Sequence, residues 1–324
     1  MSATAPTKPP VRRRSAVDQS AAWRPLDRIG LAFCWFLGLF ACALAAAIII
    51  YLLVQGVRYL RLDMLFESPL GGVSEKDTGG LKDPILGTVL VAGLATVIAL
   101  PTGVLMGIWL SEFGKPTALA RAVESAVEAT AGVPSIVLAL FGVIIFSQPW
   151  AGFASREMAG GIIYGRSFIA AGSMLSIVAL PLIIGSTREG LQSIPAHVRE
   201  AAWAVGKTKW ATIRRVLLPV VRPQIVTGTM LGLGRVIGDT AIIVLLLGAT
   251  LRLEPGGGGG AIAETLRGTG STLTSFVYIF APTGDGNQPE KAYAAAAILL
   301  LMVLALNAVV EIVARRARRN SWNG

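Results

Sequence analysis

The sequence has little charge and few of the side chains that usually carry out chemistry. Of its 324 residues, 15% are charged and 53% are hydrophobic, and there are one histidine and two cysteines. A soluble domain carries about 25% charged residues, so the composition favours a membrane protein. The single histidine, His197, and two cysteines do not supply the ligands of an ordinary zinc-type site, and we expect no metal centre.

Catalytic motifs are missing as well. The sequence contains no HExxH, no GxSxG and no Walker-type phosphate loop. The glycine run Gly256–Gly260 has no preceding strand and no GK[ST] ending, so we interpret it as a flexible link. We therefore predict a chain that is not an enzyme and that binds no cofactor itself.

The cysteines Cys34 and Cys42 both lie in the first long apolar segment. They are two helical turns apart, so they share one helix face but cannot form a disulfide with each other. Small packing residues are the favoured interpretation, and a redox or metal-binding role is the alternative.

What the sequence does contain is long apolar runs, repeated six times. Each has roughly 20 or more residues, the length that a helix needs to cross a ~30 Å hydrocarbon core. We predict an all-α membrane protein with six transmembrane helices, at about Leu31–Val57, Pro84–Leu110, Ser125–Phe146, Ile162–Gly185, Val220–Gly248 and Ala292–Ala314.

These spans divide the chain into predicted parts. Residues 1–28 form a disordered basic tail, and 84–248 form a core bundle that includes a cytoplasmic helix at 193–208. Within the last outer loop, Ser271–Pro282 is compatible with a short helix against the outer surface. The remaining predicted parts are the first span at 29–58, external loops at 59–83 and 249–291, and the last span with its basic tail at 292–324.

Charge gives the orientation. Most of the 29 Lys and Arg residues fall on one side of the predicted spans, including Arg12–Arg14, Arg214–Arg215 and Arg315–Arg319. By the positive-inside rule that side is cytoplasmic, and both termini lie there. Most of the net charge of +10 is then explained by the Lys and Arg residues that set the membrane orientation. Nucleic-acid binding is disfavoured, because aromatic residues do not alternate with the basic ones.

Glu200–Pro219 is an unusual segment, because it is basic and helical in pattern between two spans. We expect Ser193 to cap its helix, Pro195 to occupy the first turn, and Gly206 to end it. Ala201 and Ala202 would form a small flat surface beside the acidic Glu200. Such a helix suits docking into a groove of a cytoplasmic partner, and an ordinary amphipathic loop helix is the alternative.

The fifth span carries two charges, Arg235 and Asp239, four residues apart on the predicted helix face. Charges at membrane depth normally face a bundle interior or an aqueous path. We predict an anion site in which the Arg235 guanidinium binds an oxyanion. Asp239 would position Arg235 or accept a hydrogen bond from a protonated substrate oxygen. The alternative is an ion pair that locks two helices together.

The cytoplasmic segment resembles the E-A-A-x3-G-x9-I-x-L-P loop of permeases from binding-protein-dependent ABC importers. Glu200, Ala201, Ala202 and Gly206 match, as do Leu218 and Pro219, whereas Val216 replaces the preferred Ile. This resemblance implies the type I ABC importer permease fold, with the loop serving as the coupling helix that docks onto an ATPase.

The fifth span resembles the [AG]-R-x-x-G-E-T-A pattern of phosphate-importer permeases. Gly234, Arg235, Gly238, Thr240 and Ala241 match, and Asp239 replaces the Glu, which shortens the acid by one methylene. The Thr-Ala pair favours the PstA-like subunit over the PstC-like one. Gly107–Lys115 and Val133–Gly142 support that choice, and the resemblance covers roughly residues 60–315.

The resemblance implies a complex in the bacterial plasma membrane that imports inorganic phosphate. Its expected partners are a PstC-like second permease, a PstB-like ATPase dimer that binds ATP and Mg²⁺, a PstS-like external phosphate-binding protein, and the lipid bilayer. Arg235, Asp239 and Thr240 would line the substrate path. Three alternatives stay open: a permease for another oxyanion (molybdate, sulfate or phosphonate), an ATP-independent secondary transporter, and a scaffold that signals phosphate status.

Overall fold

The computed structural model describes residues 25–68, 80–114, 117–155, 165–248, 261–284, 286 and 288–321. Residues 1–24 of the predicted tail and the Gly256–Gly260 run lie outside these ranges. The described residues are helical or irregular, with no strand among them. By contacts the chain splits into two units, Met1–Tyr51 and Leu52–Gly324.

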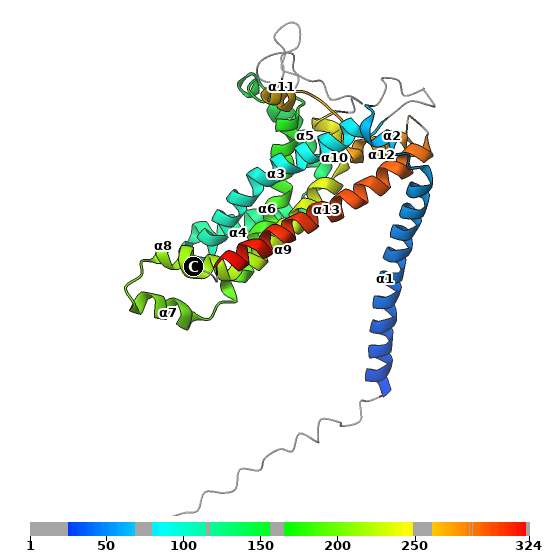
Figure 1. Ribbon diagram of the computed structural model, residues 1–324. Helices are drawn as coiled ribbons and strands as arrows, with labels where there is room; N and C mark the ends of the chain where they lie inside the picture. Colours follow the sequence, from blue (N-terminus) through cyan, green and yellow to red (C-terminus); the bar gives the residue numbers. More distant parts are fainter. Residues whose placement is uncertain are drawn as a thin grey trace, which may run out of the picture. The chain divides into compact units, whose positions relative to one another are not determined.

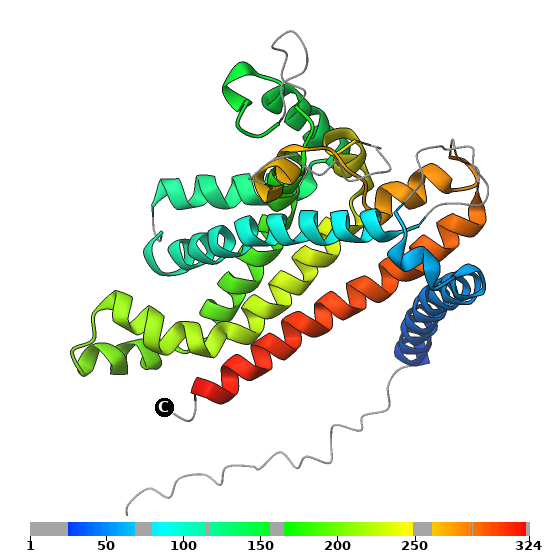
Figure 2. The same ribbon diagram turned by 45° about the horizontal axis from the view of Figure 1, so that its top comes forward.

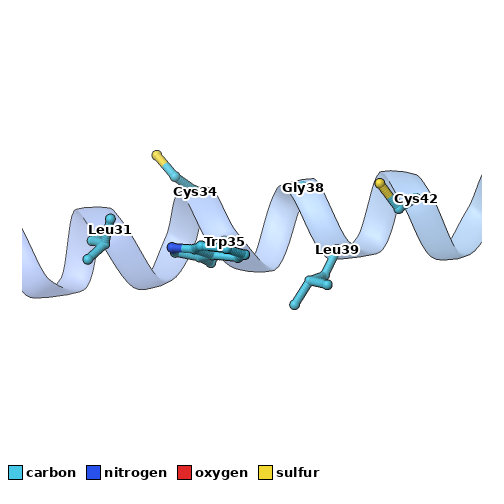
Figure 3. Close-up of a pocket in the computed structure, with 6 residues that line it drawn as sticks. All are labelled: Leu31, Cys34, Trp35, Gly38, Leu39 and Cys42. Carbon is cyan, nitrogen blue, oxygen red and sulfur yellow. The ribbon is translucent and has the colours of Figure 1, made fainter.

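The first unit contains most of α1 (Pro25–Tyr59). Its apolar side chains are exposed along the helix, among them Phe33, Trp35 and Phe40. Cys34 and Cys42 are free thiols on one side of α1, with Gly38 between them (Figure 3). They line a shallow apolar hollow together with Leu31, Trp35 and Leu39. An exposed apolar helix of this length is suited to a lipid environment.

The second unit is a helical bundle (Figures 1 and 2). Its elements are α2 (Asp63–Phe66), α3 (Lys82–Ile108), the π turn η2 (Trp109–Phe113), α4 (Ala118–Gly132), α5 (Ser135–Phe146), the 3₁₀ turn η3 (Pro149–Ala151), α6 (Phe168–Gln192), α7 (Ala196–Ala204), α8 (Lys209–Thr212), the π turn η4 (Ile213–Leu217), α9 (Leu218–Gly238), α10 (Thr240–Leu246), α11 (Ala261–Arg267), α12 (Leu273–Phe280) and α13 (Pro289–Ser321).

The centre of the bundle is α6, which packs against both α3 and α9. Small residues bring these helices close together. An added Cβ on Gly107 of α3 would lie 2.9 Å from the Cβ of Thr187, and one on Gly228 of α9 would lie 2.7 Å from Ser186. Close backbone approach through small residues is the usual way in which membrane helices associate.

Five helical runs are long and apolar enough to cross a membrane, and a sixth candidate is the bent pair α4 and α5. The count reaches the predicted six if the bent pair forms one broken span, and is five if it does not. The fourth helix also differs in position, because α6 begins at Phe168 and continues to Gln192. Ser167 caps its start by accepting a hydrogen bond from the Ala170 amide at 3.0 Å.

The expectation of one continuous helix at 125–146 is wrong. The helix axis turns by 107° between α4 and α5. Val133 and Pro134 both have extended backbone there, with ψ values of 130° and 133°. A proline disfavours the helical conformation of the residue before it and has no amide to donate, so Pro134 accounts for the break.

The fifth span is also interrupted, where the sequence pattern predicts one helix. α9 ends at Gly238, Asp239 has φ −81° and ψ 108°, and α10 begins at Thr240. The Thr274 hydroxyl of α12 donates to the Ile237 carbonyl at 2.7 Å, so α12 satisfies one of the carbonyls that the end of α9 exposes. The predicted short helix at 271–282 is thus present as α12 and is largely buried.

Candidate functional site

A cavity lies where the two broken spans meet. The larger part has a volume of about 490 Å³ and is lined by Ser135 at the start of α5 and by residues on both sides of the α9–α10 break: Gly234, Arg235, Gly238, Asp239, Thr240 and Ala241. Ser135 and Arg235 also line a smaller hollow of about 240 Å³, whose other walls come from α4, α5 and α6. The predicted path residues Arg235, Asp239 and Thr240 therefore line one cavity.

Arg235 is the exposed cation of this cavity. Within the described part of the chain, its guanidinium makes no hydrogen bond or ion pair. An arginine that is not neutralised by a neighbouring acid keeps its planar fork of N–H donors available for an oxyanion.

Asp239 does not share a helix face with Arg235, which corrects the expectation of one continuous helix. It is 7% exposed and serves as the N-cap of α10, where its Oδ1 accepts from the Ile242 amide at 3.0 Å. The described residues include no ion pair between Arg235 and Asp239, so the helix-locking alternative and the idea that Asp239 holds Arg235 directly both lose their geometric basis.

Ser135 is the residue of this cavity that the sequence analysis did not single out. It is the first residue of α5, and the N-terminal amides of a helix point toward an anion placed there. The signal was present in the sequence as Val133-Pro134-Ser135, because a serine just after a proline-induced break is placed at a helix start.

A second candidate site is the segment α7–α8, which projects from one end of the bundle (Figures 1 and 2). The predicted helix at 193–208 is shorter than expected. Ser193 caps α6 instead of α7, since its hydroxyl donates to the Gly190 carbonyl at 2.8 Å, and Pro195 is the N-cap of α7. Glu200 and Ala201 are exposed, whereas Ala202 is buried.

Gly206 ends this helix as the pattern predicts. Its φ is +76°, and its amide donates to the Trp203 carbonyl at 2.9 Å, while the Lys207 amide donates to the Ala202 carbonyl at 3.1 Å. These two bonds form a Schellman motif, which requires a left-handed residue and thus favours glycine.

The exposed surface of this segment is more apolar than the sequence analysis expected. Trp203, Val205 and Trp210 are 48%, 76% and 53% exposed, and they lie beside Glu200 and Ala201 along the segment. We call the set Glu200, Ala201, Trp203, Val205 and Trp210 the α7–α8 surface. Exposed tryptophans beside a charge are typical of an interface.

Leu218 and Pro219 lie at the start of α9 and not on the exposed α7–α8 segment that contains Glu200–Gly206. Leu218 packs, together with Val216, on a buried cluster that includes Ile108, Leu191 and Leu217. Pro219 stands at the first turn of α9, directly after η4. A proline cannot donate to the turn before it, and the π turn lies at that point.

Comparison with known proteins identifies the family of this chain. The model of a family described as "Binding-protein-dependent transport system inner membrane component" matches residues 99–319. A protein named phosphate transport system permease protein PstA 1, from Mycobacterium tuberculosis H37Rv, is 30% identical over 252 residues, which cover 77% of this chain and 75% of that protein.

Two further matches extend the comparison. Phosphate transport system permease protein PstC 2 of Mycobacterium bovis is 30% identical over 284 residues, covering 82% of this chain and 85% of that one. The fold resembles a chain of a solved bacterial alginate ABC transporter, with a TM-score of 0.60 at 15% identity over 92% of this chain and 98% of that chain. The chain therefore belongs to the family of binding-protein-dependent transport system inner membrane components, the permease subunits of ABC importers.

Proposed function

We propose that this chain is the PstA-like permease subunit of an ATP-driven importer of inorganic phosphate. It would form the path with a PstC-like second permease in the bacterial plasma membrane, with both termini in the cytoplasm. The names of its relatives support this substrate, and they include both PstA and PstC permeases. The Thr240-Ala241 pair is what favours the PstA-like type. The observation that carries the proposal is Arg235, which has no hydrogen-bond or ion-pair partner among the described residues and lies on the wall of a cavity between two broken helices.

The cavity offers groups of both kinds that hydrogen phosphate needs. Arg235, the Ser135 hydroxyl and the start of α5 provide donors for the charged oxygens. Asp239 provides a carboxylate that accepts a hydrogen bond from a protonated oxygen. Sulfate and molybdate carry no proton near neutral pH, so a carboxylate acceptor disfavours them over hydrogen phosphate.

The energy for transport would come from a partner. The chain has no Walker motif, so ATP and Mg²⁺ would bind a PstB-like ATPase dimer that docks on the α7–α8 surface. Movement of Glu200–Gly206 would reach α9 through Leu218 and Pro219 and would turn Arg235 toward one side of the membrane and then the other. A PstS-like protein would deliver phosphate from outside.

The test is uptake of labelled phosphate by proteoliposomes that contain the two permeases and the ATPase, with the binding protein added outside. We expect uptake that requires ATP and that excess sulfate or molybdate does not inhibit. Arg235→Gln is expected to abolish uptake while the ATPase still co-purifies, and the matched control Arg121→Gln, on the exposed start of α4, is expected to retain it.

Each rival has its own result in that experiment. Competition by another oxyanion without competition by phosphate would move the substrate to that anion. Uptake without ATP would indicate a secondary transporter. Normal uptake by Arg235→Gln would overturn the anion site. If this variant transported phosphate normally but lost phosphate-dependent signalling, the scaffold alternative would be favoured.

A further inference from the structure

Glu112 is a buried carboxylate that the proposed transport cycle does not use. It lies on the π turn η2, at the end of α3, and its side chain is 7% exposed. Burying a carboxylate without partners is unfavourable, so its surroundings explain its position.

The main partner of Glu112 is Arg199 of α7, which is 87 residues later in the chain. Nε and Nη2 of Arg199 donate to the same carboxylate oxygen, Oε1, at 3.2 and 2.8 Å. Nη1 donates to the Ile194 carbonyl at 2.8 Å, and Nη2 also donates to the Leu191 carbonyl at 2.7 Å. One guanidinium therefore joins α7, the carbonyl end of α6 and the end of α3.

A second cation reaches the same turn from the other side of Gly206. The Lys209 ammonium of α8 donates to the Glu112 backbone carbonyl. It also lies 4.4 Å from the ring centroid of Phe113, a favourable cation–π distance. Both halves of the α7–α8 segment are thus held to η2 by charged side chains.

Apolar packing contributes little to holding α7. Ala202 is the one buried residue of α7, and Val198 is a partly buried residue that packs on the neighbouring cluster. The four hydrogen bonds of Arg199 are consequently the most extensive described contact between α7 and the bundle. The chain itself connects α7 to α6 and α8, whereas α3 has no covalent link to it nearby.

We propose that the contacts of Arg199 and Lys209 with Glu112 on η2 transmit movement of α7 to α3, and we call this set of contacts the joint. This inference rests on the proposed function, since it assumes that a partner pushes on α7. Arg199 and Glu112 are positioning residues, and Lys209 reinforces them. With the joint intact, α3, α6 and α9 move together around the cavity. Without it, α7 follows the ATPase while α3 stays behind.

The first experiment compares phosphate transported with ATP hydrolysed in the same proteoliposomes. Glu112→Gln keeps the side-chain size and removes the charge. We expect it to lower phosphate transported per ATP about tenfold, within the range of coupling free energies between sites, while the ATPase co-purifies in the wild-type ratio. The double variant Glu112→Gln/Arg199→Gln should be no worse than the worse single variant, because the two residues act as one unit.

The matched control is Glu124→Gln, which removes the partner of Arg188 in an ion pair between α4 and α6 that does not involve α7. Its transport-to-hydrolysis ratio should equal that of the wild type. The joint would be refuted if Glu112→Gln transported as much phosphate per ATP as the wild type. It would also be refuted if the fold-losses of the two single variants multiplied in the double variant, because the residues would then act independently. If Glu112→Gln does not assemble, the exposed Lys209→Ala should lower the ratio by a smaller factor, and an unchanged ratio there counts against the joint.

The second experiment does not depend on the substrate. Spin labels at the exposed positions Lys207→Cys and Leu105→Cys, in full-length chain with Cys34 and Cys42 changed to Ser, report the distance between the coupling segment and α3. We expect a narrow distance distribution that broadens in Glu112→Gln, and an equally narrow one would refute the joint. A different result would refute the proposed function alone: the wild type fails to take up phosphate, while the distance distribution still broadens in Glu112→Gln.

Discussion

At the scale of single residues, Asp239 combines two roles that different substitutions separate. Its carboxylate caps α10 through the Ile242 amide, and it also lines the cavity with Arg235. Asparagine can perform the first role and cannot perform the second in the same way, because it has no charge and carries donors of its own. Alanine can perform neither.

We therefore predict different effects for Asp239→Asn and Asp239→Ala. Asp239→Ala should lower the free energy of unfolding by about 1 kcal/mol, the usual effect of losing an N-cap, whereas Asp239→Asn should leave it nearly unchanged. Both should let sulfate compete with phosphate. Thermal unfolding of the purified chain and competition in proteoliposomes measure the two effects, and equal stability of the two variants would contradict the capping role.

Gly206 allows a second prediction at this scale, since its φ of +76° is unfavourable for a side chain. Gly206→Val should destabilise the end of α7 by about 1–2 kcal/mol, and Gly206→Asn by less, because asparagine adopts the left-handed region more easily. No atom lies within 4 Å of an added Cβ, so the effect is one of backbone conformation. Amide hydrogen exchange over Ala196–Ala204 would detect it, and identical protection in both variants would rule it out.

At the scale of elements, the two broken spans produce the site. α5 packs against α10, and the N-terminal end of each lies at the cavity. A pair of straight spans would place Ser135 and Thr240 within continuous helices, where their amides are used by the helix itself. The breaks therefore place two helix N-termini beside the cavity, and interrupted spans are tolerated in membranes where the backbone lines a cavity.

Pro134→Ala tests this role of the α4–α5 break. Without the proline, Val133 is free to become helical, so the 107° bend should weaken and Ser135 should move relative to Arg235. We expect the KM for phosphate to rise about tenfold, an effect of roughly 1.4 kcal/mol. Pro101→Ala is the matched control, because Pro101 lies inside α3, which continues through it. A similar KM in both variants would mean that the bend does not shape the site.

The sequence allows some of these elements to be predicted and leaves others to tertiary contacts. Long apolar runs indicated the spans. Pro134 is a local signal for the α4–α5 break, although the apolar run predicts one continuous span there. Asp239 gave no such sign, because an acid in an apolar run is compatible with a continuous helix. At this break the Ile237 carbonyl accepts from the Thr274 hydroxyl of α12, a contact 37 residues away that the sequence pattern does not reveal.

The same distinction holds for the α7–α8 surface. Gly206 could be predicted as a helix end from its residue type alone. The burial of Ala202 and the exposure of Trp203 and Val205 could not, because they depend on which face of α7 Arg199 holds against the bundle.

At the scale of the whole molecule, α7 and α8 lie at one end of the second unit, and α11 and α12 lie at the other (Figures 1 and 2). The end of α13 lies on the same side as α7. This separation suits a protein that meets an ATPase on one membrane face and a binding protein on the other.

We predict that the α7–α8 surface decides assembly with the ATPase. Trp203→Ala should weaken ATPase binding at least tenfold, as truncation of an interface tryptophan typically does, and Glu200→Lys should also weaken it. Thermal stability should change little, because both side chains are exposed. The matched control is Trp150→Ala, since Trp150 is an exposed tryptophan on η3, away from the α7–α8 surface. Co-purification of the ATPase measures the outcome, and equal loss in the control would refute the assignment.

The π turns η2 and η4 have a consequence for which sequence changes the chain can accept. A π turn is an α-helix with one additional residue accommodated in a single turn. Deleting one residue from Ile213–Leu217 would restore an α turn and leave α9 in its register. Deleting one residue between Val220 and Gly234 would rotate Arg235 by about 100° and shift it by about 1.5 Å. One-residue length changes in α9 should therefore be rejected, whereas a deletion within Ile213–Leu217 keeps Arg235 in place and changes only the spacing between Gly206 and Leu218.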